Sequence, residues 1–246
     1  MRETHPEPAD ATLRAPLLAA AISGAVYFLG AFLPQEDGPD VETATAAQIR
    51  TFLAAHDTGI RIGAAAGAVA IPLILVFTTS LARLIRAYLP GSQLADLVVG
   101  GGVLVAFWHW VVIAGGSTTL VQRLDRYDLA RVDNATLWGW YGLSNFTHLF
   151  ADLGMAGIAT VMAAASIAIL QARFVARWLG WLGVAFAAGG AIGKIGVMAA
   201  VRGLADVWFV GIFGWWLWVL AVAVGCMVRL RRSRRASTVP AAPQPA

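Results

Sequence analysis

Apolar residues occur in six long, nearly uninterrupted runs, and the short segments between them hold most of the charged residues. The runs cover approximately residues 16–33, 62–82, 95–120, 141–170, 178–200 and 208–228. A helix rises about 1.5 Å per residue and the hydrocarbon layer of a bilayer is about 30 Å thick, so a span needs about 20 apolar residues. Only closed backbone hydrogen bonding is stable in lipid. The pattern therefore predicts an all-α, polytopic transmembrane helical bundle of six spans.

The composition agrees with lipid as the solvent of these helices. Hydrophobic residues make up 59% of the chain and charged residues 13%, with a mean hydropathy of +0.69. Soluble domains carry about 25% charged residues. We therefore predict the lipid bilayer as a partner and no nucleic acid, because the basic residues behind the net charge of +4 lie where membrane topology needs them.

The distribution of arginines predicts the orientation of the spans. With the N-terminus in the cytoplasm, eleven arginines fall in inner segments and six in outer segments, as the excess of basic residues in cytoplasmic loops requires. Six spans then return the C-terminus to the cytoplasm. We expect a disordered cytoplasmic N-terminus at 1–13, the six-helix domain at 14–230, and a basic, then Pro/Ala-rich, disordered tail at 231–246.

The first outer segment predicts a short amphipathic helix lying against the outer face of the bundle. Thr45 and Gln48 fit a capping box, in which each side chain closes a free N–H of the first turn. Gly59 would end the helix. Apolar and aromatic residues then recur at helical spacing, namely Ile49, Phe52, Leu53, His56 and Ile60.

Small residues and a basic cluster predict further contacts. Two Gly-x-x-x-Gly pairs, Gly63/Gly67 and Gly189/Gly193, are typical of faces where membrane helices approach closely, and such faces would also suit a homodimer. After the last span lies a cluster of arginines, which is a topology signal and also a candidate for binding anionic lipid. Its members are Arg229, Arg231, Arg232, Arg234 and Arg235.

Four titratable residues lie within the predicted spans, namely His109, His148, Asp152 and Lys194. Inserting Asp or Lys at the centre of a bilayer costs about 2.5–3.5 kcal/mol, so such residues face the bundle interior and find partners. His148 and Asp152 are four residues apart and share one helix face. We expect His109 near mid-membrane and Lys194 in the outer half of its span. The four would then form one buried polar layer, with Asp152 as the counter-charge of Lys194.

Several roles are open for this layer. The leading hypothesis is a buried clamp that fixes helix register in a non-enzymatic membrane protein. An alternative is a proton or ion relay in a small proton-coupled or solute transporter. A second alternative is a metal or haem site in a membrane-embedded redox protein, with His109, His148 and Asp152 as ligands of sufficient type. A third is an imine on Lys194. No standard catalytic motif is present, and we predict no cofactor.

Two segments carry a resemblance. One is the run 52–63 (FLAAHDTGIRIG), and the other is the run 177–183 (RWLGWLG) that opens the fifth span. Both resemble a broad group of uncharacterised multi-span bacterial membrane proteins, common in actinobacteria, and the Ala-, Gly- and Arg-rich composition fits that source. The resemblance covers about residues 14–230 and contains no catalytic residue. It implies a multi-pass protein of the bacterial cytoplasmic (inner) membrane and no particular activity.

Overall fold

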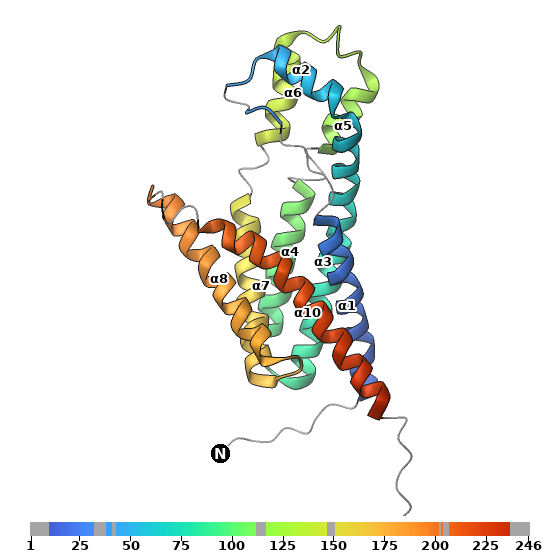
Figure 1. Ribbon diagram of the computed structural model, residues 1–246, viewed down its shortest axis with the longest axis vertical. Coiled ribbons are helices and arrows are strands. Elements are labelled where there is room, and N and C mark those ends of the chain that lie inside the picture. Colours follow the sequence, from blue (N-terminus) through green and yellow to red (C-terminus); the bar gives the residue numbers. More distant parts are fainter. Residues whose placement is uncertain are drawn as a thin grey trace, which may run out of the picture.

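All regular structure that the computed structural model describes is helical (Figure 1). The described residues are 10–31, 38–40, 43–111, 117–146, 151–201, 203 and 207–236. The main helices are α1 (Asp10–Ala31), α2 (Ala46–Ala55), α3 (Asp57–Tyr88), α4 (Leu94–Trp108), α5 (Ser117–Arg126), α6 (Asn134–Phe146), α7 (Ala151–Ala172), α8 (Arg177–Met198) and α10 (Trp208–Ala236).

Six of these helices are long and apolar enough to cross a membrane, which confirms the predicted number of spans. The candidate spans are Thr12–Gly30, Asp57–Tyr88, Leu94–Val111, Gly154–Ala172, Arg177–Gly196 and Trp208–Ser233. The chain therefore has the helices of a multi-pass membrane protein.

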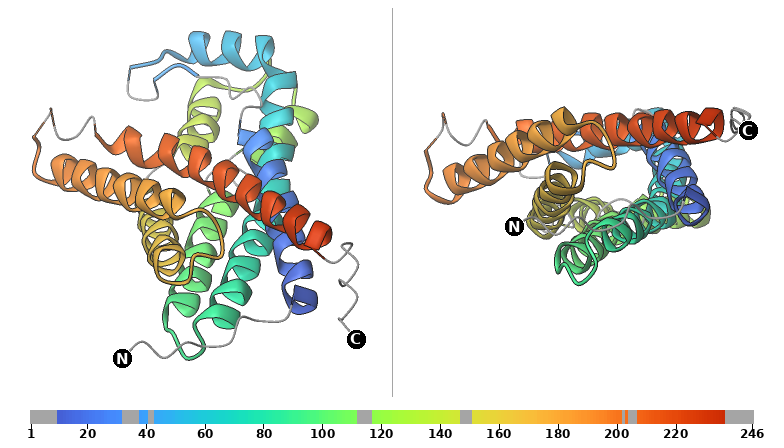
Figure 2. Two further views of the ribbon diagram at one scale, coloured as in Figure 1. Left: turned by 60° about the horizontal axis from the view of Figure 1, so that its bottom comes forward. Right: turned by 90° about the horizontal axis from the view of Figure 1, so that it is seen from below.

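The six long helices form a closed ring, as the view along the bundle shows (Figure 2). In order around the ring, the main contacts join α1 to α3, α3 to α4, α4 to α7, α7 to α8, α8 to α10, and α10 back to α1. The largest buried side chains of the core are Trp215, Trp218, Phe77 and Phe174. Each helix thus packs mainly on two neighbours, and smaller contacts join α7 to α3 and to α10.

A second, smaller unit, which we call the head, lies at one end of the ring (Figure 1). It consists of α2, α5, α6 and the first turns of α3. Its own hydrophobic cluster is centred on Ile49, Leu53, Leu120, Leu137 and Tyr141. We call the end of the bundle next to the head the head end, and the opposite end, where the last turns of α10 lie, the far end.

The head corrects the predicted boundaries of two spans. The sequence predicts spans at 95–120 and 141–170, and the described parts of these two spans are Leu94–Val111 and Gly154–Ala172. Leu120 and Tyr141 instead pack together in the head, together with Leu137. Apolar residues at the outer ends of both runs are therefore buried against protein, so hydropathy alone lengthened the two spans.

The helix α2 begins where the capping box predicts. Thr45 is its N-cap and exchanges hydrogen bonds with Gln48, and Ile49 and Leu53 form its buried face. Its main contacts are with α6 rather than with the ends of the spans. The helix ends at Ala55 and not at Gly59, because the backbone bends at His56 and α3 begins at the next residue.

The helical parts also extend beyond the predicted domain of residues 14–230. The first helix α1 begins at Asp10, and Leu13 is buried in the core. The last helix α10 continues to Ala236. Arginine is a good helix former, so the basic cluster continues the last span as a helix instead of starting the tail.

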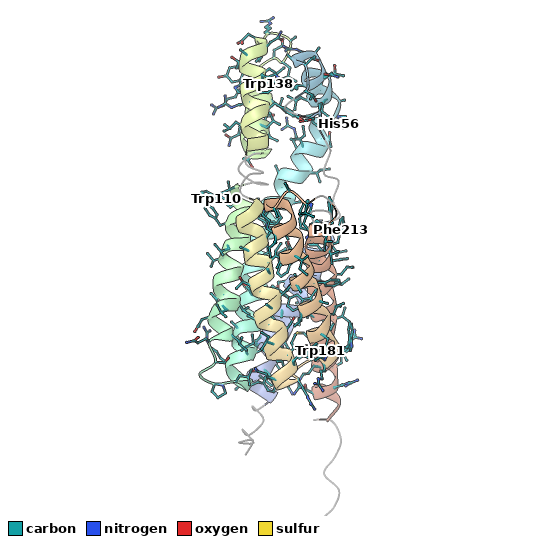
Figure 3. The ribbon with its side chains drawn as sticks, turned by 90° about the vertical axis from the view of Figure 1, so that its left-hand side faces the viewer. His56, Trp110, Trp138, Trp181 and Phe213 are labelled. Carbon is teal, nitrogen blue, oxygen red and sulfur yellow. The ribbon has the colours of Figure 1, made fainter. Side chains whose placement is uncertain are left out.

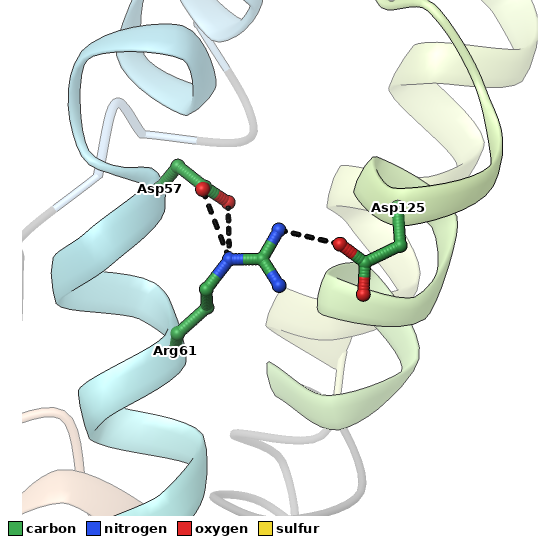
Figure 4. Close-up of polar contacts among 3 residues, drawn as sticks. All are labelled: Asp57, Arg61 and Asp125. Carbon is green, nitrogen blue, oxygen red and sulfur yellow. Dashed lines mark hydrogen bonds and ion pairs between the residues drawn. The ribbon is translucent and has the colours of Figure 1, made fainter.

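A three-residue ionic contact joins α5 to the first turns of α3 (Figure 4). Arg61 of α3 binds Asp57, one turn earlier, with Nε 2.9 Å from the carboxylate, and Asp125 of α5, with a guanidinium N 2.6 Å away. The guanidinium of Arg61 lowers the pKa of Asp125 through this hydrogen bond. All three side chains are more than a third exposed, and exposed ion pairs stabilise little, so the contact contributes only a small part of the stability of the head.

Large aromatic side chains point outward at both ends of the bundle (Figure 3). Trp110 and Phe213 lie toward the head end and are 59% and 54% exposed, whereas Trp181 lies toward the far end and is 57% exposed. Large aromatic side chains are enriched at membrane–water interfaces, where their rings lie at the level of the lipid head groups. The two levels therefore agree with a hydrocarbon layer between them.

Candidate functional site

The candidate site is a buried polar chain built around His109. The helix α4 ends at Trp108 and continues as a π-helical turn over residues 109–111, and such turns often occur at functional positions. The side chain of His109 is 4% exposed. His109 is next in sequence to Trp110, which lies toward the head end of the bundle (Figure 3). The mid-membrane position of His109 stays a prediction.

Three side chains form this chain, from α10, α1 and α4. Trp215 Nε1 donates to the hydroxyl of Tyr27 at 2.9 Å, and this hydroxyl lies 3.2 Å from Nε2 of His109. The other ring nitrogen of His109, Nδ1, is 2.9 Å from the carbonyl oxygen of Val105. Tyr27 and Trp215 are also buried, at 3% and 1% exposure, so water does not replace these partners.

The chemistry of the donors assigns every proton in this chain. A carbonyl oxygen can only accept, so Nδ1 of His109 carries a proton and donates to Val105. In a neutral ring Nε2 is then the acceptor, and the Tyr27 hydroxyl donates to it. The same hydroxyl accepts from the indole of Trp215, which can only donate. The neutral Nδ1–H form of His109 therefore satisfies every group in the chain.

The chain crosses the ring. Neither α1 nor α10 is a main packing partner of α4 within the described chain, yet Tyr27 of α1 reaches His109 across the ring, and Trp215 of the neighbouring α10 bonds to Tyr27. Edge-on aromatic contacts surround the polar atoms: the ring of Tyr27 is 5.6 Å from that of His109 and 6.2 Å from that of Trp215. The bond between Tyr27 and His109 thus links α1 to α4, which are not neighbours in the ring.

Trp108 forms one wall of the site. Its ring centroid is 4.6 Å from that of His109, at an interplanar angle of 78°. It packs on Gly154 of α7, where a Cβ would overlap the indole. Its Nε1 is buried and meets no hydrogen-bond partner among the described residues.

The other predicted members of the polar layer are placed only in part. His148 lies outside the described residues, and Asp152 lies in the first turn of α7 with a side chain that is not described. The contact between Gly154 and Trp108 puts the start of α7 at the level of His109. Lys194 is half-buried near the end of α8 and makes an interaction within the structure. The ring order places α7 between α4 and α8.

Sequence reasoning missed Tyr27 and Trp215 as the partners of His109. The available signal was a phenol inside an otherwise apolar span, together with deep tryptophans whose N–H groups need acceptors. Trp218 follows the same rule, since its Nε1 donates to the carbonyl of Leu179 at 3.1 Å. A search restricted to charged and titratable groups overlooks such neutral partners.

The geometry also bears on the metal hypothesis. Both ring nitrogens of His109 take part in hydrogen bonds, so ligation through Nε2 would need the Tyr27 contact to break. Among the described residues, no group of three His, Cys, Asp or Glu side chains could hold a metal ion. His148 and the side chain of Asp152, the other predicted ligands, lie outside this description.

The predicted glycine pairs differ from each other. A Cβ on Gly193 would overlap the backbone of Trp208, and one on Gly189 would lie 2.9 Å from Val210, so this pair lies where α8 meets α10. Gly67 is buried, but a Cβ on Gly63 would meet nothing within 4 Å among the described atoms. The Gly189/Gly193 pair thus marks a close helix contact, while Gly63 faces open space.

Comparisons with known proteins identify no relative of this chain. No family model matches the sequence, and no curated protein or solved structure matches it significantly. The resemblance to actinobacterial membrane proteins stays a prediction from the sequence.

Proposed function

We propose that the protein is a non-enzymatic, multi-pass protein of the bacterial cytoplasmic membrane in which the chain of His109, Tyr27 and Trp215 is a structural clamp. One observation carries the proposal: every donor in this buried chain has an acceptor, and the chain joins helices that are not neighbours in the ring. A group that relays protons must change its protonation state. Protonation of Nε2 would turn it into a donor and leave the hydroxyl proton of Tyr27 without its acceptor.

The clamp is tested by nitrogen NMR of protein labelled at its four histidines. The expected signal of His109, identified by its loss in a His109→Asn variant, is that of a neutral ring with the proton on Nδ1. A doubly protonated ring, or a neutral ring with the proton on Nε2, would contradict the assignment of donors.

A small proton-coupled or solute transporter is the second candidate, and one observation favours it. The indole N–H of Trp108 is buried beside His109 and has no partner among the described residues. Such an N–H is available to donate a hydrogen bond to a transported ligand. Proteoliposomes with a pH-sensitive dye separate the two functions. The clamp predicts no proton movement above that of protein-free liposomes. A proton flux that His109→Asn abolishes, and that His56→Asn in the head preserves, would establish the transporter.

We further propose that both termini lie in the cytoplasm and the head outside. The excess of arginines in the predicted inner segments supports this orientation. The single cysteine, Cys226, is buried, so cysteines introduced elsewhere can be labelled selectively. A membrane-impermeant maleimide should label Gln122→Cys in the head of intact cells, and Ser237→Cys in the tail only after permeabilisation. The reverse pattern would invert the topology.

A further inference from the structure

A groove of about 630 Å³ lies at the far end of the bundle, between the α7–α8 connection and the last turns of α10. It is far from the polar chain of His109, which lies near the head end. Its lining combines basic and apolar side chains, and its principal members are Arg173, Arg229, Arg232, Trp178, Val224 and Val228.

Three arginines and no acidic residue line the groove. Arg229 is held in place, because its guanidinium donates to the hydroxyl of Tyr88 at 2.6 Å and lies 5.5 Å from that ring. Arg173 and Arg232 are exposed, and no carboxylate of the described chain forms an ion pair with either. The backbone of Arg173 has a φ of 55°, a left-handed conformation that is uncommon for a residue with a side chain. The groove thus presents uncompensated positive charge.

The wall of the groove is apolar and faces outward. Trp178 is 60% exposed, Val224 53% and Val228 42%. In a bundle surrounded by lipid these side chains meet acyl chains, and Trp178 lies at the start of α8, where aromatic residues favour the membrane interface. A ligand that suits both halves of the groove carries a negative head and an apolar tail.

We propose that this groove binds an anionic phospholipid, whose phosphate lies at Arg173 and Arg232 and whose acyl chain follows Trp178, Val224 and Val228. Basic pockets at the ends of membrane helices recognise anionic head groups in this way. The sequence suggests a diffuse attraction of lipid to the whole basic cluster, whereas the groove combines Arg232 of that cluster with Arg173 from the α7–α8 connection and with one apolar wall. The proposal rests on insertion of the six helices into a membrane and is independent of the clamp and of the orientation.

The experiment titrates the full chain in detergent with phosphatidylglycerol or phosphatidylcholine of identical acyl chains, and reads bound lipid by native mass spectrometry. The test variant is Arg173→Gln/Arg232→Gln. The matched control is Arg83→Gln/Arg231→Gln, which removes the same charge from exposed residues that do not line the groove. At about five-fold in affinity per arginine, the test variant should bind phosphatidylglycerol about 25-fold more weakly. The control should bind it as the wild type does, and phosphatidylcholine should bind weakly to all three proteins.

Three results would overturn the proposal. Equal losses in the test and control variants would show a general attraction to basic charge. Equal binding of the two lipids would remove the role of the negative head group. Displacement of phosphatidylglycerol by an equal concentration of inorganic phosphate would show an anion site to which the apolar wall contributes nothing. If the double variant does not fold, Arg232→Gln alone, on the exposed last turns of α10, should weaken binding about five-fold, and an unchanged affinity would reject the site.

Discussion

Replacing Tyr27 by Phe removes one oxygen atom from the centre of the polar chain and keeps the ring that packs around it. The hydroxyl of Tyr27 both accepts from Trp215 and donates to His109, so the substitution breaks two interhelical hydrogen bonds. It leaves an indole N–H and a ring nitrogen without partners, and both side chains are buried. Because the ring stays, the change creates almost no cavity, and the loss of stability reports the hydrogen bonds.

The expected size follows from these two bonds. Interhelical hydrogen bonds in membrane proteins are worth about 0.6 kcal/mol on average and at most about 1.7 kcal/mol. Two of them amount to about 1–3 kcal/mol, and the upper part of this range applies because both partners stay buried and unsatisfied. The clamp therefore predicts a clear loss in the free energy of unfolding.

The measurement is unfolding by SDS in mixed micelles, followed by circular dichroism. The control is Tyr88→Phe, which removes a hydroxyl that binds Arg229 at the far end, where both residues are only half-buried. Water can replace that bond, so the control should lose less than about 1 kcal/mol. If Tyr27→Phe is as stable as the wild type, or loses no more than Tyr88→Phe, the polar chain does not clamp the helices.

Two further predictions concern the head and the helix contacts. The lowered pKa of Asp125 means that its bond to Arg61 stabilises the head while the carboxylate is ionised. This stability is present above the ordinary pKa of 3.8 and is lost as the pH falls through the lowered pKa. Acidification should therefore reduce the melting temperature of the wild type more than that of Asp125→Asn. Equal pH dependences of the two melting temperatures would contradict this. Gly193→Ala should destabilise the protein by about 1–3 kcal/mol in SDS unfolding, because its Cβ overlaps the start of α10. Gly63→Ala should be neutral or stabilise by about 0.5–1 kcal/mol, and similar effects of the two substitutions would refute the contact.

Hydropathy was sufficient to predict the six spans, because the length of a helix and the cost of exposed polar backbone in lipid leave few alternatives. The same measure failed where apolar residues are buried by protein. Leu120 and Tyr141 extend two apolar runs, yet they pack in the head. Local signals were more reliable there: the capping box of Thr45 and Gln48 begins α2 as the sequence predicts.

For the candidate site, the sequence predicted the burial of His109 but not its hydrogen-bond partner. Burial of His109 follows from the cost of placing a polar ring in lipid, and the structure confirms it. Its partner does not follow, since the sequence predicts a charged layer while the chain supplies the neutral hydroxyl of Tyr27. The partner depends on ring order, and the closure of α10 against α1 brings Trp215 and Tyr27 together over 188 residues of sequence.

Two kinds of contact hold the bundle, and each acts between different helices. Lipid provides no hydrophobic drive for helices to associate, so close packing and hydrogen bonds must do it. Small residues serve neighbours in the ring: Gly101 lies against Gly157 where α4 meets α7, and Gly193 lies against the backbone of α10. The polar chain adds a link between helices that are not neighbours, since its bond between Tyr27 and His109 joins α1 to α4. If the polar chain is the proposed clamp, the bond between Tyr27 and His109 restrains a pair of helices that the glycine contacts do not join, and its loss should then cost stability that no glycine contact can restore.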